Sequence, residues 1–187
     1  MTRKRIILIL DLLLLIVLVL IDQYTKYLAI LRLRGKEAFP LIKGVLEFTY
    51  VENHGAAFGM LQNAGFLFVA IAVIMLVAVA YALWRTPAKR KYLLFHLVLT
   101  VLSAGAAGNL IDRLNSTFVV DFIYVSLIRF PVFNVADIYV TCSAFALFFM
   151  MLTCYKDEPF DFLKPAGHSA KDAEEDVPEE DAGDDPA

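Results

Sequence analysis

Four long apolar segments constrain the fold of this chain more than any other feature of its sequence. The hydrocarbon core of a bilayer is about 30 Å thick and needs roughly 20 apolar residues per helix. Segments 6–27, 65–84, 92–111 and 135–154 meet that requirement. Hydrophobic residues make up 59% of the chain and come in blocks without strand or helix periodicity. The sequence therefore predicts an all-α membrane protein with four transmembrane helices.

The first apolar segment follows a basic start, Met-Thr-Arg-Lys-Arg, as the apolar part of a secretory signal peptide would. Its apolar run is long, however, and no small-x-small cleavage site follows it. We therefore interpret residues 6–27 as a retained transmembrane helix.

The net charge of −3 combines two regions of opposite sign. Residues 1–155 carry a net charge of +6, whereas twelve acidic and three basic residues follow from Lys156 onward. We predict a membrane-embedded domain over residues 1–155 and an acidic, disordered tail over residues 156–187. A regulatory or partner-binding tail is the alternative to a solvated, dispensable one.

Basic residues near the ends of the spans predict the orientation, because loops rich in lysine and arginine favour the cytoplasm. One group precedes the first span and the other fills the short loop between the second and third spans: Arg3, Lys4, Arg5, Arg85, Lys89, Arg90 and Lys91. Both chain ends are therefore expected in the cytoplasm. Four cations in the first long loop argue the opposite way, although they are diluted over more than thirty residues: Arg32, Arg34, Lys36 and Lys43.

Two segments outside the spans have the character of strands. Residues 46–51 alternate between apolar and polar types, and residues 117–125 are rich in valine, phenylalanine and tyrosine. We expect them to form a small extracytoplasmic β-sheet in the loop region at the membrane surface.

Asp121 and Asp137 lie in apolar stretches with no lysine or arginine within three residues of either. Ionisable groups at membrane depth are costly and are candidates for function. If the two carboxyls meet in a partly dry site they share one proton, so that one acts as a base on water while the other polarises a carbonyl. That is the chemistry of an aspartic protease. The alternative is that each carboxyl only caps or hydrogen-bonds a nearby turn.

The other acidic residues of the membrane region have local explanations. Asp22 precedes Lys26 by four residues, the favourable order for an ion pair on a helix. Asp112 adjoins Arg113, so we expect one of these two side chains to tether the other. Asp11 is close enough to the basic N-terminus to extend toward the interface or to stay protonated.

Three asparagines, Asn53, Asn109 and Asn134, stand at the same predicted membrane face as the two aspartates. A buried amide without a partner costs free energy, and asparagines can also hold an extended peptide by its backbone. Nearby glycines allow close approach, either for helix packing or for substrate access: Gly55, Gly59, Gly105 and Gly108. The three histidines are scattered, so we expect no metal and no cofactor, and nothing in the chain indicates a nucleic-acid partner.

Five motifs in order resemble one family. They are Asp22-Gln-Tyr-Thr-Lys26, Asn53-His-Gly-Ala-Ala-Phe-Gly59, Gly108-Asn-Leu-Ile-Asp-Arg113, Val119-Val-Asp-Phe122 and Phe133-Asn-Val-Ala-Asp137. Together they are similar to the motifs of lipoprotein signal peptidase, the bacterial signal peptidase II, over about residues 6–154. Each motif is weak alone, but five in sequence are highly specific.

The resemblance implies a four-helix aspartic endopeptidase of the bacterial inner membrane. Such an enzyme removes the signal peptide of diacylglyceryl-modified prolipoproteins by cutting just before the lipidated cysteine. It also implies a role for individual residues. Asp121 and Asp137 would be catalytic, Asn53, Asn109, Arg113 and Asn134 would line the substrate site, and Asp22, Lys26, Gly108 and Asp112 would support it. We expect a monomer that contacts membrane lipids, with its active site near the outer face.

Two features depart from the family pattern. Residues 123–131 lack the tryptophan and histidine often found before the second catalytic motif, and Ile138 replaces a small residue. These departures leave the aspartates in place but affect the expected contacts above the substrate. A small proton-coupled transporter or channel and a membrane scaffold without enzymatic activity are the alternative functions.

Overall fold

The computed structural model describes residues 2–55, 65–154 and 163. Four long helices and a three-stranded sheet make up this part of the chain. In order they are α1 (Arg3–Leu33), β1 (Phe39–Ile42), β2 (Leu46–Asn53), α2 (Gly65–Arg85), α3 (Leu93–Ser116), β3 (Val119–Tyr124) and α4 (Val135–Thr153), with short 3-10 turns η2 (Arg90–Tyr92) and η3 (Ser126–Ile128). The four predicted spans are confirmed, since these helices are long and apolar enough to cross a membrane.

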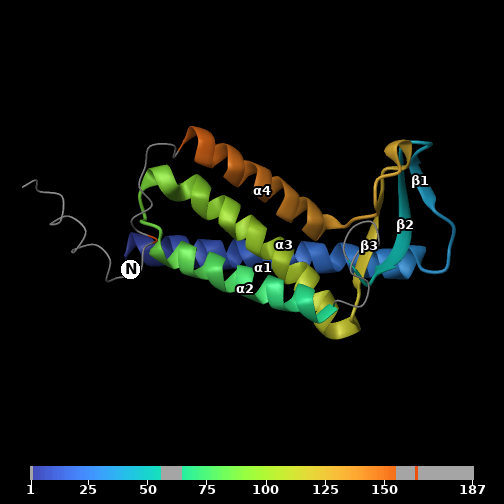
Figure 1. Ribbon diagram of the computed structural model, residues 1–187, viewed down its shortest axis with the longest axis horizontal. Coiled ribbons are helices and arrows are strands. Elements are labelled where there is room, and N and C mark those ends of the chain that lie inside the picture. The colour runs from blue at the N-terminus through green and yellow to red at the C-terminus, as the bar shows by residue number, and fades with distance from the viewer. Residues whose placement is uncertain (1, 56–64, 155–162, 164–187) are drawn as a thin grey trace, which may run out of the picture.

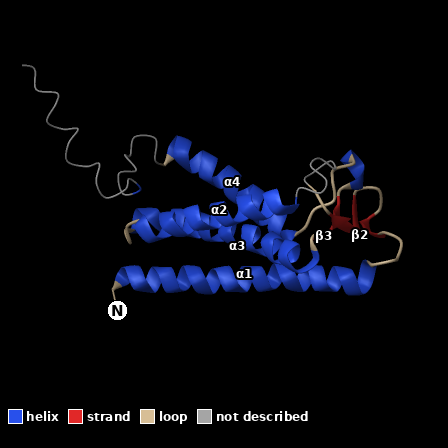
Figure 2. Cartoon of the chain, turned by 60° about the horizontal axis from the view of Figure 1, so that its bottom comes forward, coloured by secondary structure: helices blue, strands red, loops and turns tan. Residues whose placement is uncertain are grey.

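Helix α3 is the central helix of the bundle, and α1, α2 and α4 pack around it (Figures 1 and 2). Of the most apolar window of α3, 61% is buried, against 6 to 17% in the other three helices. Most large apolar side chains of the outer helices are exposed, as lipid-facing residues are. The small residues Ala104, Gly105 and Ala106 of α3 are buried, which permits close helix contact.

Helix α1 continues six residues beyond its predicted end at residue 27 and stops at Leu33. Its 31 residues span about 46 Å at roughly 1.5 Å per residue, so the helix is longer than the hydrocarbon core is thick. Gly35 follows with a positive φ of 71°, a conformation that glycine adopts without steric cost. The end of α1 therefore projects past the bundle to the sheet, as Figure 1 shows.

The sheet has the antiparallel order β1-β2-β3. Strands β2 and β3 confirm the two predicted strands, whereas β1 was missed. Pro40 within Phe39–Ile42 weakens the sequence signal for a strand, yet proline is tolerated in an edge strand such as β1. Gly44, with a positive φ of 75°, makes the turn from β1 into β2.

The sheet lies at one end of the bundle, and the N-terminus lies at the other (Figure 1). Helix α4 begins near the sheet and ends at the same end of the bundle as the N-terminus. At that end the ammonium of Lys4 donates hydrogen bonds to the carbonyls of Trp84 and Thr86 and so caps the C-terminus of α2. The predicted tail over residues 156–187 lies outside the described residues, apart from residue 163.

Candidate active site

The N-terminus of α4 provides the frame of the site. The side chain of Asn134 accepts a hydrogen bond from the backbone N–H of Asp137 at 3.0 Å, and the Asp137 carboxylate accepts one from the Asn134 N–H at 3.1 Å. This reciprocal pair is a capping box. From α1, the carboxylate of Asp22 accepts the N–H of Ala136 at 2.9 Å. The first turn of α4 thus fixes the side chain of Asp137.

Strand β3 brings Asp121 to the same place. The backbone of Phe133 pairs with Ile123 of β3, so the residue before the cap of α4 runs beside the strand. The side chain of Asp121 is 2% exposed. Its Oδ1 accepts a hydrogen bond from Nδ2 of Asn134 at 2.6 Å, and its Oδ2 accepts one from Nδ2 of Asn53 at 2.8 Å.

Two asparagines connect the two carboxyl groups. Nδ2 of Asn134 also donates to Oδ1 of Asn109 at 3.2 Å, and Nδ2 of Asn109 donates to Oδ1 of Asp137 at 2.8 Å. Each of the four carboxyl oxygens of Asp121 and Asp137 therefore accepts one hydrogen bond. The structure thus brings the two aspartates into one hydrogen-bond network.

A buried lysine of α1, Lys26, contacts this network through Asn109. Nζ of Lys26 lies 2.8 Å from Asp22, 2.9 Å from Asp112 and 2.9 Å from Oδ1 of Asn109, so three acceptors face its three N–H donors. The predicted Asp22–Lys26 pair is confirmed. The expected tether between Asp112 and Arg113 is wrong, because Asp112 pairs with Lys26. Neighbours on a helix point in different directions, and Asp112 points toward α1.

Gln23 and Gly108 complete the contact between α1 and α3. Nε2 of Gln23 donates to the carboxylate of Asp112 at 2.8 Å and to the carbonyl of Gly108 at 3.1 Å. A Cβ added at Gly108 would collide with the carboxylate of Asp22. Only glycine therefore lets Asp22 reach both Lys26 and α4. Sequence reasoning missed Gln23, although it lies inside the Asp22–Lys26 motif.

Asp121, Asp137, Asn53 and Arg113 line one cavity of about 500 Å³. The guanidinium of Arg113 lies 5.0 Å from the ring centroid of Phe68. The two aspartates have no cation near them in the sequence, yet Arg113 lines the same cavity in space. In the described part of the chain, Arg113 forms no ion pair that would withdraw it from this cavity.

Burial and, as the second cause, the charge of Asp137 together raise the pKa of Asp121 to about 7. Hydrogen bonds from Asn53 and Asn134 oppose the shift because they favour the ionised form. Near neutral pH, Asp121 thus has a substantial protonated fraction. This is the condition under which two neighbouring carboxyls share one proton.

Thr141 and Cys142 also line the cavity and were not expected there. Thr141 follows Asp137 by four residues, the helical spacing that places two side chains on one face, and this spacing could have revealed it. Cys142 is exposed and lines the cavity. Phe130, Pro131, Val132 and Phe133 provide an apolar wall. Gly55 lies in the lining, and Gly59 lies outside the described residues.

Asp11 lies apart from the site. Its carboxylate is 2.7 Å from Nδ1 of His96 on α3, so it has a partner within the bundle and does not extend to the interface. Gly105 serves packing, since an added Cβ would lie 2.5 Å from the carbonyl oxygen of Ala136.

Comparisons with known proteins agree with this geometry. Residues 14–153 match the model of the family described as signal peptidase (SPase) II. The lipoprotein signal peptidase of Symbiobacterium thermophilum is 43% identical over 141 residues, which are 74% of this chain and 91% of that protein. The lipoprotein signal peptidase of Caldanaerobacter subterraneus is 42% identical over 135 residues, which are 72% of this chain and 90% of that protein.

Solved structures are similar as well. A bacterial membrane enzyme determined at 2.3 Å resolution by the in meso method has a TM-score of 0.69 and 30% identity, covering 80% of this chain and 91% of that one. A second bacterial membrane enzyme, determined at 1.9 Å resolution, has a TM-score of 0.66 and 33% identity. The match covers 76% of this chain and 92% of that one. With its fold, its paired carboxyls and the match to the family model, this chain belongs to the signal peptidase II family.

Proposed function

We propose that Asp121 and Asp137 are the catalytic pair with which this signal peptidase II cleaves the signal peptide from diacylglyceryl-modified prolipoproteins, just before the lipidated cysteine. One observation carries the assignment. Both carboxyls belong to one amide network and line one cavity. The capping interaction of Asp137 does not exclude catalysis, because the same network leaves its side chain in the cavity lining.

The raised pKa of Asp121 supports different roles for the two carboxyls, with Asp121 as the acid and Asp137 as the base. Protonated Asp121 donates its proton to the oxygen of the scissile carbonyl, while Asp137 accepts a proton from a water whose oxygen adds to the carbonyl carbon. Asp137 then gives its proton to the amide nitrogen and Asp121 takes back a proton from the tetrahedral intermediate as the C–N bond breaks. Both aspartates return to their starting protonation states.

The remaining site residues have two kinds of role in this proposal. Arg113 and Asn53 line the cavity, and we assign them to substrate contact. Arg113 has donors available to a peptide carbonyl, which would fix the scissile bond. Asn134 is 0% exposed, so it positions the carboxyls from within the protein. Asn109 shares that task through its hydrogen bonds with Asn134 and Asp137.

Beneath these residues, the contact of Lys26 with Asp22, Asp112 and Asn109 supports the network. Gly108 belongs to the same support because it leaves room for Asp22. We assign all four of these residues, Asp22, Lys26, Gly108 and Asp112, to holding the catalytic end of α4 in place.

The position of the basic residues supports the predicted orientation of the chain in the membrane. Arg3, Lys4 and Arg5 begin α1, and the basic α2–α3 loop lies at the same end of the bundle. Because basic loops favour the cytoplasm, we place this end and both chain ends in the cytoplasm of a bacterial cell. The sheet and the two aspartates then face the outer side of the inner membrane. There a monomer can take lipidated prolipoproteins directly from the surrounding membrane lipids.

The test is cleavage of a lipidated precursor by purified Asp121→Asn and Asp137→Asn proteins. Each substitution keeps the side-chain shape but removes the acid, so we expect cleavage to fall by at least about a hundredfold. Asp11→Asn is the matched control, because it removes a partly buried acid outside the cavity and should retain cleavage. Cleavage should also continue in excess chelator. Normal cleavage by either folded active-site variant would refute the catalytic assignment.

A further inference from the structure

A second cavity lies between the end of α1 and the sheet. It has a volume of about 580 Å³, and its lining includes Leu28, Phe39 and Phe122. Phe122 follows Asp121 in β3, and successive side chains of a strand point to opposite faces. The sheet therefore separates this cavity from the one that holds the two aspartates. Nothing in the proposed cleavage reaction requires it.

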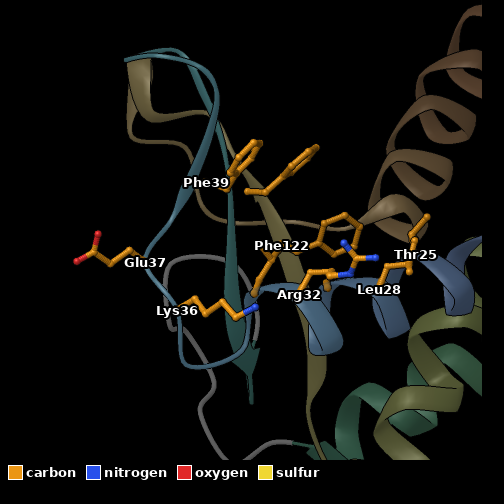
Figure 3. A pocket seen from close by; sticks show the side chains of 10 residues that line it. Thr25, Leu28, Arg32, Lys36, Glu37, Phe39 and Phe122 are labelled. Carbon is orange, nitrogen blue, oxygen red and sulfur yellow. The ribbon is translucent and has the colours of Figure 1, made fainter.

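Two cations border this apolar cavity. Arg32 comes from the last turn of α1 and Lys36 from the segment after it. Figure 3 shows the Lys36 side chain extending toward the cavity and the Arg32 guanidinium lying beside Phe122, whereas the carboxylate of Glu37 points away. Within residues 2–55 and 65–154 neither Arg32 nor Lys36 forms an ion pair. The cavity thus combines an apolar interior with positive charge at its edge.

A neighbouring cation shows the contrast. Arg34 lies between Arg32 and Lys36 in the sequence. Its guanidinium pairs with Glu52 at 3.0 Å and lies 5.6 Å from the ring centroid of Tyr50. The protein therefore neutralises Arg34 with its own acid. It leaves Arg32 and Lys36 for another anion.

The depth of the cavity in the membrane indicates the source of that anion. A helix that enters the hydrocarbon after Arg5 leaves it about 20 residues later, near residue 25. Leu28 and Arg32 then follow in the headgroup layer, and the long side chain of Arg32 reaches the level of the lipid phosphates. An acyl chain from the same lipid can enter between Leu28 and Phe122.

We propose that this cavity binds an anionic phospholipid, with its phosphodiester held by Arg32 and Lys36 and an acyl chain against Leu28 and Phe122. Two cations at one edge favour a lipid with net negative charge over a zwitterionic one. The diacylglyceryl group of a lipidated precursor is neutral and would leave both cations without a partner. The site is independent of the catalytic assignment.

Native mass spectrometry of the purified protein tests this directly, with phosphatidylglycerol and phosphatidylcholine of identical acyl chains as probes. We expect phosphatidylglycerol to bind at least about fivefold more tightly, and Arg32→Gln or Lys36→Gln to weaken its binding about fivefold each. Lys43→Gln is the matched control. It removes the same charge from the exposed β1–β2 turn outside the cavity, and binding should not change.

Three outcomes would overturn the proposal: equal affinity for the two lipids, equal loss in the Lys43→Gln control, or displacement of bound phosphatidylglycerol by a lipidated precursor. The last would assign the cavity to the substrate's acyl chains. Both target side chains are exposed, so their replacement should leave the fold intact; Lys36→Gln alone carries the test if Arg32→Gln is unstable. Measuring binding on the Asp121→Asn protein as well separates lipid binding from catalysis.

Discussion

Nδ2 of Asn134 lies 2.6 Å from Oδ1 of Asp121. The same residue caps α4 through its Oδ1, which accepts the N–H of Asp137. One buried side chain therefore starts the helix that carries one aspartate and holds the other aspartate in place. Local helix formation and the geometry of the candidate catalytic pair are consequently coupled through Asn134.

Two substitutions of Asn134 should separate its two tasks. Serine can cap a helix but cannot span to both Asp121 and Asn109, so Asn134→Ser should keep most of the stability and lose cleavage. Alanine loses the cap as well, which costs about 1 kcal/mol more. Thermal unfolding and precursor cleavage, measured on both variants, check this prediction. Full activity of Asn134→Ser would contradict the bridging role.

Removal of the buried Lys26 should destabilise the protein. Lys26→Met leaves Asp22 and Asp112 without their shared cation, and breaking a buried ion pair costs about 3–5 kcal/mol. Arg34→Ala is the control, because the Arg34–Glu52 pair is largely exposed and is expected to contribute less than about 1 kcal/mol. Denaturation midpoints in detergent compare the two. Similar losses in both variants would argue against a supporting role of Lys26.

Gly108→Ala should disturb the site from a distance. The new Cβ meets the carboxylate of Asp22, which must move away from Lys26 and from the N-terminus of α4. We expect a loss of about 1–3 kcal/mol and a lower cleavage rate. Gly65→Ala is the matched control, since no atom lies within 4 Å of its added Cβ. An unchanged Gly108→Ala enzyme would show that Asp22 need not hold its position.

The pKa of Asp121 predicts how activity depends on pH. This carboxyl is protonated below about 7 and ionises as the pH rises through that value. If protonated Asp121 donates to the scissile carbonyl, kcat/KM should decline above about pH 7. A profile of precursor cleavage from pH 5 to 9 measures this limb. An activity that rises through this range would reverse the proposed roles of the two carboxyls.

The same pKa also predicts how stability depends on pH. The folded state holds the Asp121 proton more tightly than the unfolded state, whose pKa is near the ordinary value of 3.8. The stability gained from this proton is fully present below the unfolded pKa and is lost as pH rises through about 7. The melting temperature should therefore fall between pH 5 and pH 8, and Asp121→Asn should reduce that fall. An identical fall in the variant would exclude Asp121 as its source.

Much of the fold follows from the sequence alone. The thickness of the hydrocarbon core fixes how many apolar residues a span needs, so the four helices could be recognised without any tertiary information. The Asp22–Lys26 pair followed from helical spacing in the same way. Strand β1 was not recognisable, because Pro40 is acceptable only once the position of the strand at the sheet edge is known.

The tertiary structure decided which charged and polar side chains of the site contact one another. Asp112 turned toward Lys26 of another helix and not toward adjacent Arg113, and Arg113 entered the cavity of two aspartates that have no cation nearby in the sequence. Sequence spacing determines which residues share a face of one helix or strand. Which faces then meet depends on packing across the bundle and on the pairing of β3 with the chain before α4. The sequence singled out Asp121 and Asp137, and only the folded chain joins them through Asn134 and Asn109.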